Sequence, residues 1–252
     1  MSFAFGAWLA IMVWDGAVAE QATQQANVGA AVDEAVSAIS RGELAAAVWT
    51  FSDLLDDPSV ELTARQRGTV HFNRGYAYQA SGSLPEAIGD YTIAVEIEPQ
   101  DYLALFNRGI AFEDGGQIER AMRDYTAAIG IMRTDPRIFY NRGNLFFDAG
   151  RLGLAIADYG RAIALDPNYA DAYANRAGVF AAMGAVDLAI ADIRTARALE
   201  AERSAGGTFG IELAPGRSVD LPIVSPMRDA VTSALAATLW GGITVPLEPD
   251  DF

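Results

Sequence analysis

Asn73-Arg74-Gly75 is the first of four copies of one phrase, which recur at intervals of 34 residues. The later copies are Asn107-Arg108-Gly109, Asn141-Arg142-Gly143 and Asn175-Arg176-Ala177. A fixed period of this size is typical of stacked repeats, in which each unit is a helical hairpin that cannot bury its apolar face alone. The sequence therefore predicts an all-α solenoid of helix-turn-helix hairpins.

Glycines and capping residues divide the chain at the same period. A glycine follows the first predicted helix of each repeat, where left-handed backbone geometry favours a turn. These turn glycines are Gly82, Gly116, Gly150 and Gly184. The predicted capping residues between repeats are Asp101, Asp135 and Asn168. The repeats are therefore expected at 68–101, 102–135, 136–169 and 170–203, after a divergent hairpin at 28–61 that caps the stack.

Small and aromatic residues recur in register with the phrase. They are Ala87, Ala121, Ala155 and Ala189, then Tyr91, Tyr125 and Tyr159, then Ala94, Ala128, Ala162 and Ala196. This pattern resembles the tetratricopeptide repeat over residues 28–203. The resemblance implies a right-handed superhelical solenoid whose first helices line a concave groove that binds other proteins. The last repeat departs from the pattern, because Ala177 replaces the glycine and Ile193 replaces the tyrosine.

The composition limits the classes of partner. The chain has 252 residues, 51% of them hydrophobic, and a net charge of −15, so it can build a core but repels nucleic-acid phosphate and anionic lipid. It contains no cysteine and a single histidine, His71, which excludes disulfides, thiolate metal sites and histidine clusters. We expect His71 to be a packed or partly buried side chain. All 18 basic residues are arginine, which suggests a GC-rich bacterial genome.

The N-terminal segment resembles a secretory signal peptide. Residues 3–14 are nearly all apolar, too few to span a bilayer comfortably, and Ala17-Val18-Ala19 offers a small-x-small cleavage site before Glu20. This predicts a signal peptide at 1–19, a linker at 20–27 and export to a bacterial periplasm. No Lys or Arg precedes the apolar run, so a retained N-terminal helix and a cytoplasmic protein stay as the alternative.

The period is lost after the last repeat. Residues 204–252 are expected to form a short mixed C-terminal extension with a capping helix at about 226–240, which would cover the exposed end of the solenoid.

An aspartate follows each phrase arginine by 16 residues. The pairs are Arg74 and Asp90, Arg108 and Asp124, Arg142 and Asp158, and Arg176 and Asp192. This spacing puts the guanidinium on the first helix and the carboxylate on the second helix of one hairpin, where arginine can form two parallel hydrogen bonds. We interpret these residues as structural ion pairs, and the alternative is an arginine stripe for acidic ligands.

The asparagines of the phrase are the candidates for partner binding. The resemblance implies that Asn73, Asn107, Asn141 and Asn175 face the groove, where amides can hold the backbone of an extended peptide. The alternative is hydrogen bonding between adjacent units. Neighbouring candidates on this face are Phe72, Tyr76, Phe106, Tyr140, Asn144 and Phe147, with the acidic Glu113, Asp114 and Asp148. These residues favour a neutral or basic peptide with apolar anchors and disfavour an acidic carboxyl-terminal tail.

No motif of an enzyme is evident in the sequence. It contains no phosphate-binding glycine loop, nucleophile elbow or metal-spaced His/Glu motif. We therefore expect a non-catalytic scaffold with no catalytic residue, cofactor or metal. The alternative from another class is an enzyme with a site between the groove and the C-terminal segment.

Overall fold

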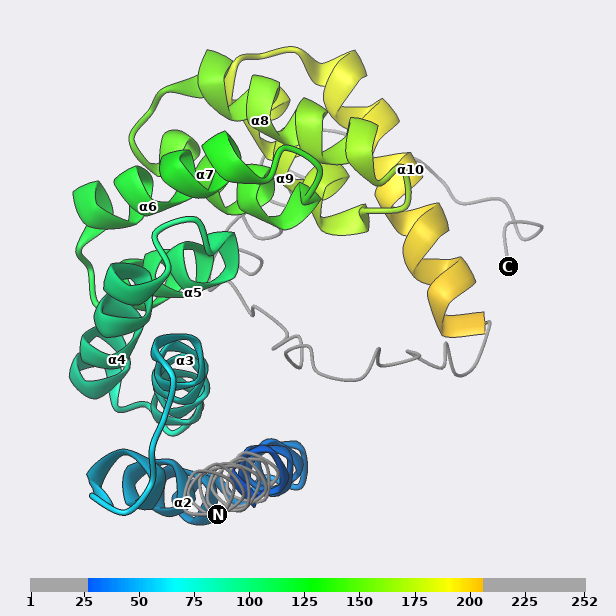
Figure 1. Ribbon diagram of the computed structural model, residues 1–252. Helices are drawn as coiled ribbons and strands as arrows, with labels where there is room; N and C mark the ends of the chain where they lie inside the picture. Colours follow the sequence, from blue (N-terminus) through cyan, green and yellow to red (C-terminus); the bar gives the residue numbers. More distant parts are fainter. Residues whose placement is uncertain (1–26, 206–252) are drawn as a thin grey trace, which may run out of the picture. The chain divides into compact units, whose positions relative to one another are not determined.

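The computed structural model describes residues 27–205, which form helices and contain no strand (Figure 1). Residues 27–40 form the first helix. The helices that follow are α2 (Leu44–Asp56), α3 (Ala64–Ala80), α4 (Leu84–Ile97), α5 (Tyr102–Asp114), α6 (Ile118–Ile131), α7 (Pro136–Asp148), α8 (Leu152–Leu165), α9 (Ala170–Ala182) and α10 (Val186–Ala205). The predicted all-α architecture of helical hairpins is confirmed.

A glycine with positive φ joins the two helices of every described hairpin. The φ values are 79° at Gly42, 82° at Gly82, 70° at Gly116, 68° at Gly150 and 74° at Gly184. Side chains other than glycine rarely adopt this backbone region, so these five residues fix the turns. The turn glycines expected from the period are confirmed.

Two of the three predicted capping residues cap a helix. The Asp101 carboxylate accepts hydrogen bonds from the backbone N–H of Leu103 and Ala104, and that of Asp135 accepts one from Arg137. The expectation for Asn168 was wrong, because the N-cap of α9 is Tyr169, which makes no side-chain cap.

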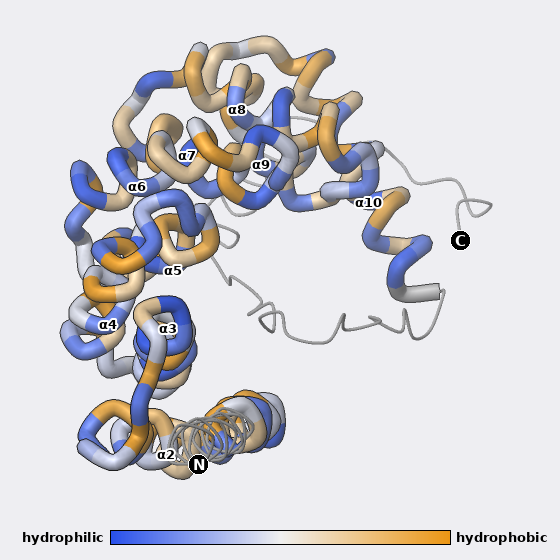
Figure 2. Tube along the Cα trace, in the orientation of Figure 1, coloured by the Kyte–Doolittle hydropathy of each residue, from blue (hydrophilic) through white to orange (hydrophobic). Residues whose placement is uncertain are grey.

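The described chain divides into two compact units, residues 27–131 and 132–205. Within each unit, consecutive helices pack together, and the first helices of neighbouring hairpins also touch: α3 contacts α5, and α7 contacts α9. Figure 2 shows hydrophobic and hydrophilic residues interleaved along the helices, as expected where one face is buried. In each unit, we call the side on which α3 meets α5, or α7 meets α9, the first-helix face.

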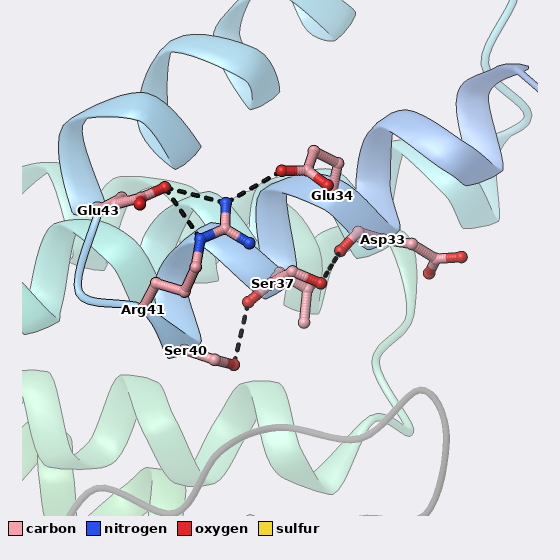
Figure 3. Close-up of polar contacts among 7 residues, drawn as sticks. Asp33, Glu34, Ser37, Ser40, Arg41 and Glu43 are labelled. Atoms are coloured by element: carbon pink, nitrogen blue, oxygen red, sulfur yellow. Dashed lines mark hydrogen bonds and ion pairs between the residues drawn. The ribbon is translucent and has the colours of Figure 1, made fainter.

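The divergent hairpin shares a core with the first repeat. Phe51 and Leu54 of α2 are buried in one cluster with Val70 and Ala77 of α3. At its turn, the Arg41 guanidinium bridges the carboxylates of Glu34 (3.0 Å) and Glu43 (2.9 Å), as Figure 3 shows. These groups are solvent-exposed, so the bridge adds little stability, and the apolar cluster holds the hairpin to the stack.

Each repeat tyrosine packs beneath the glycine of its own phrase. A Cβ at Gly143 would lie 2.8 Å from the ring of Tyr159, and one at Gly109 would lie 2.6 Å from the ring of Tyr125. Neither position therefore has space for a methyl group. The last repeat carries Ala177 with Ile193, so the added methyl group coincides with loss of the ring.

Several sequence predictions lie outside the described residues. These are the signal peptide at 1–19, most of the linker at 20–27, and nearly all of the extension at 204–252 with its helix at 226–240. Between residues 27 and 205, no helix combines the length and apolar character that crossing a membrane requires.

Candidate partner-binding face

All four expected arginine–aspartate pairs form, with the same geometry. In each, arginine Nε lies 2.7 Å from one carboxylate oxygen and Nη2 lies 2.9 Å from the other. The aspartates are buried and the arginines are half-buried. Charge-assisted double hydrogen bonds of this kind fix both side chains, so the arginines form clamps within hairpins and do not form an open stripe.

An aromatic ring four residues further along the first helix covers each of these guanidinium groups. The Cζ atom of Arg142 lies 5.6 Å from the ring centre of Phe146, and that of Arg108 lies 5.7 Å from Phe112. The other two rings are Tyr78 and Phe180. An aromatic residue recurs four positions after each of these arginines in the sequence, so this contact could have been predicted, but the sequence analysis did not include it.

His71 joins the first of these pairs. Its Nδ1 lies 2.8 Å from Asp90 Oδ1, and Arg74 also donates through Nη1 to Ser52 Oγ on α2 at 3.0 Å. Burial alone would raise the pKa of Asp90, but hydrogen bonds from Arg74 and His71 outweigh it and hold that pKa below its usual value. The expectation that His71 is a packed or partly buried side chain is confirmed.

In the first unit, the phrase asparagines bond to their own helices. Asn73 donates to the carbonyl of Thr69 at 2.9 Å, and Asn107 donates to that of Leu103 at 3.0 Å. Both side chains are half-buried. The amide groups therefore keep contact with solvent on this face while one N–H is satisfied locally.

In the second unit, the amides connect two helices. Asn175 Nδ2 donates to Tyr140 Oη (3.0 Å) and to Asn144 Oδ1 (2.8 Å), which also accepts from the Tyr159 hydroxyl at 2.8 Å. Asn141 and Asn144 are only 2% and 3% exposed. This is the hydrogen bonding between adjacent repeats that the sequence analysis gave as an alternative to partner binding. Asn141 Oδ1 is also buried and accepts no hydrogen bond from the described residues.

Most of the expected aromatic anchors belong to the core. Tyr76, Phe106 and Tyr140 are buried, whereas Phe72 and Phe147 are half-exposed. Phe72 lies 5.8 Å from the ring of Tyr91, which donates its hydroxyl to Gln79 at 2.9 Å. Phe72 thus has both a packed side and a solvent side.

Two aspartates at equivalent repeat positions carry uncompensated charge. Asp114 ends α5 and Asp148 ends α7, and both reach solvent. Partial desolvation raises the pKa of each carboxyl, and a 3.4 Å hydrogen bond from Gln79 only partly offsets this at Asp114. No described cation lies within ion-pair distance of either one, unlike the four clamped aspartates. Glu113 differs, because it accepts the Tyr125 hydroxyl at 2.6 Å.

The period, the turns and the clamps define an α-helical repeat protein. A profile described as tetratricopeptide repeat matches residues 72–136, and another described as TPR repeat matches residues 143–184. The chain is a tetratricopeptide-repeat protein. No curated protein matches the sequence.

Solved structures show the same fold. MamA from Desulfovibrio magneticus RS-1 is 15% identical with a TM-score of 0.62, over 70% of this chain and 96% of that one. Another MamA structure is 18% identical with a TM-score of 0.60, over 75% and 98% of the two chains. YrrB, a TPR protein with an unusual peptide-binding site, is 18% identical with a TM-score of 0.55, over 69% and 87%. At these identities the similarity is one of fold.

Proposed function

We propose that this protein is a non-catalytic scaffold that binds extended segments of other proteins along the first-helix face of each unit, and that these segments carry positive charge. The tetratricopeptide repeats support the role as an interaction scaffold. The unpaired carboxylates of Asp114 and Asp148 support the preference for a cation. YrrB has a peptide-binding site on the same fold, but the charge preference rests on the residues of this chain.

The charge argument compares two sets of aspartates. In the first set, a buried aspartate such as Asp158 is paired with an arginine, here Arg142, which neutralises its charge. Asp114 and Asp148 are partly desolvated without a cation, so the folded protein bears a cost for keeping them ionised. A guanidinium or ammonium group from a partner would remove that cost. Binding of a cationic partner therefore stabilises the ionised forms of Asp114 and Asp148, because water solvates these carboxylates only in part.

Apolar side chains beside these carboxylates provide contact area. Leu103 and Ile110 of α5 are half-exposed, as is Phe72 of α3. Leu103, Asn107, Ile110 and Asp114 follow one another at helical spacing and share one side of α5. A peptide lying there would meet apolar surface, an amide and a carboxylate in sequence.

Binding of two matched synthetic peptides tests the proposal. One alternates apolar residues with arginine, and the other has glutamate in place of each arginine. We expect isothermal titration calorimetry to detect binding of the arginine peptide only. The substitutions Asp114→Asn and Asp148→Asn should each weaken binding to the unit that carries the residue by up to about fivefold, which corresponds to about 1 kcal/mol for a solvent-exposed ion pair.

Glu86→Gln is the matched control for these substitutions, because Glu86 is an exposed carboxylate on α4, a second helix. It should leave the affinity unchanged. Equal binding of both peptides, or binding of neither, would contradict the proposed charge preference.

We further propose that the protein acts in a bacterial periplasm. The support is the apolar run at residues 3–14 followed by Ala17-Val18-Ala19. Mass spectrometry of the chain purified from fractionated cells tests this, since cleavage leaves Glu20 as the first residue. An intact N-terminus on protein recovered from the cytoplasm would overturn the proposal.

A further inference from the structure

One side of α10 carries two exposed arginines where the other second helices carry small or apolar residues. Arg194 corresponds in the period to Thr92, Thr126 and Gly160, and Arg197 corresponds to Val95, Ile129 and Ile163. Both arginines are exposed, and none of the described carboxylates lies within ion-pair distance of them. The stripe also includes Val186, which is 49% exposed, and Ile190. We call these four residues the α10 stripe.

The equivalent side of the earlier second helices receives the following hairpin. Arg108 Nη1 of α5 lies 3.5 Å from Thr92 Oγ1 of α4. A Cβ added to Gly160 of α8 would lie 3.7 Å from Arg176 Nη1 of α9. The position that Arg194 holds therefore meets the clamp arginine of the next repeat.

Arg194 consequently excludes another repeat of the same kind. A further copy would bring its clamp arginine against Arg194, and two like charges a few ångströms apart repel. The α10 stripe therefore accepts a different occupant, and its charge selects an acidic one.

We propose that residues 248–251 of this chain, Glu248-Pro249-Asp250-Asp251, dock on the α10 stripe. Three carboxylates within four residues complement Arg194 and Arg197, and the apolar part of the stripe receives neighbouring apolar residues such as Leu247. The proposal depends on α10 alone and not on the first-helix face.

The tether between the two segments makes this contact favourable. The acidic segment follows α10 by about 40 residues, and the stripe from Val186 to Arg197 covers about 17 Å of helix, a distance that about five or six extended residues span. A connected segment acts at an effective concentration in the millimolar range. Weak ion pairs then suffice to populate the docked state.

Disulfide crosslinking in the full chain tests the proposal, because the protein contains no native cysteine. The tested chain carries Ala201→Cys and Pro249→Cys. Ala201 is exposed and lies one helical turn beyond Arg197. We expect an intramolecular disulfide to form at low salt. Its rate should fall at least fivefold in the Arg194→Glu/Arg197→Glu variant and return when Asp250→Arg and Asp251→Arg are added. Each rate is normalised to the reaction of the same thiols with a small disulfide.

Two controls separate docking from random encounter. Arg123→Glu makes the same charge change at an exposed site on α6 and should leave the crosslinking rate unchanged. In the second control, the cysteine replaces Ala149, in the turn after α7, instead of Ala201. Its disulfide with the thiol introduced in place of Pro249 should form slowly and without dependence on the arginines.

Equal rates in the parent and charge-reversed chains would overturn the proposal. Crosslinks between molecules, with a yield that rises with protein concentration, would also overturn it, because they would assign the stripe to a second copy. Circular dichroism of the variants should match the parent, since both arginines lie on the surface.

Discussion

Removing one clamp arginine should destabilise the protein more than removing both members of the clamp. In the Arg142→Ala variant, the Asp158 carboxylate loses hydrogen bonds of 2.7 and 2.9 Å while its side chain is only 10% exposed. Breaking a buried pair on one side costs about 3–5 kcal/mol, because the remaining charge is buried without a partner. Slight solvent access at Asp158 places the expected loss near the lower end, at about 3 kcal/mol.

The double variant Arg142→Ala/Asp158→Ala should recover part of this loss. It removes the orphaned charge and leaves the cost of lost packing, including the guanidinium over Phe146. We therefore expect the double variant to be more stable than Arg142→Ala alone, with a coupling energy of about 1–3 kcal/mol. Asp158→Ala alone provides the fourth corner of the cycle.

Urea denaturation followed by circular dichroism measures the four free energies of unfolding. Because repeat proteins can unfold in parts, hydrogen exchange should be recorded as well, and the loss of protection should concentrate in α7 and α8. A loss below about 1 kcal/mol for Arg142→Ala, or a double variant less stable than the single one, would refute the reasoning that the clamp protects a buried charge.

The remaining predictions concern packing and ionisation. Gly143→Ala should lower the free energy of unfolding by about 1–3 kcal/mol in thermal unfolding, because the new methyl group meets Tyr159. The double variant Gly143→Ala/Tyr159→Ile should lose less stability than the sum of the two single variants, and strict additivity would contradict this. Asp148→Asn should stabilise the unliganded protein at pH 7 by a few tenths of a kcal/mol. Desolvation raises the pKa of Asp148, so the ionised carboxylate destabilises the folded protein at any pH above that pKa. A lower urea midpoint for the variant would count against this. The pKa of Asp90 is lowered, so its contribution to stability is present above about pH 4 and is lost as the pH falls further; Asp90→Asn should flatten the acid side of the melting temperature profile, and an unchanged slope would exclude this carboxyl as its source.

The sequence predicted those features that depend on the period. Helical hairpins, turn glycines and the pairing of Arg142 with Asp158 all follow from spacing, because a 16-residue offset in a hairpin brings two side chains together. The recurring aromatic residue four positions after each clamp arginine was equally visible. Residues four apart on a helix are neighbours, so this offset places the ring over the guanidinium.

Features that depend on contacts between repeats were not predictable from the spacing. Asn107 and Asn141 occupy the same repeat position, yet Asn107 bonds its own helix while Asn141 is buried without a hydrogen bond to its carbonyl. The surroundings also differ, because Tyr140 and Asn144 beside Asn141 on α7 both accept hydrogen bonds from Asn175 of α9. A repeat-level pattern cannot contain this side-chain network, since Tyr140 and Asn144 do not recur at the equivalent positions of the other repeats.

The pairing of Ala177 with Ile193 limits how hairpins of this chain can be recombined. A chimera with α9 joined to α8 would press the Ala177 methyl group into the ring of Tyr159, and the reverse junction would leave a hole beneath Gly143 that Ile193 fills incompletely. Crossovers inside a hairpin should therefore yield poorly folded products, whereas crossovers in the loops between hairpins should preserve both partners. The smallest unit that can be inherited or engineered intact is the complete hairpin.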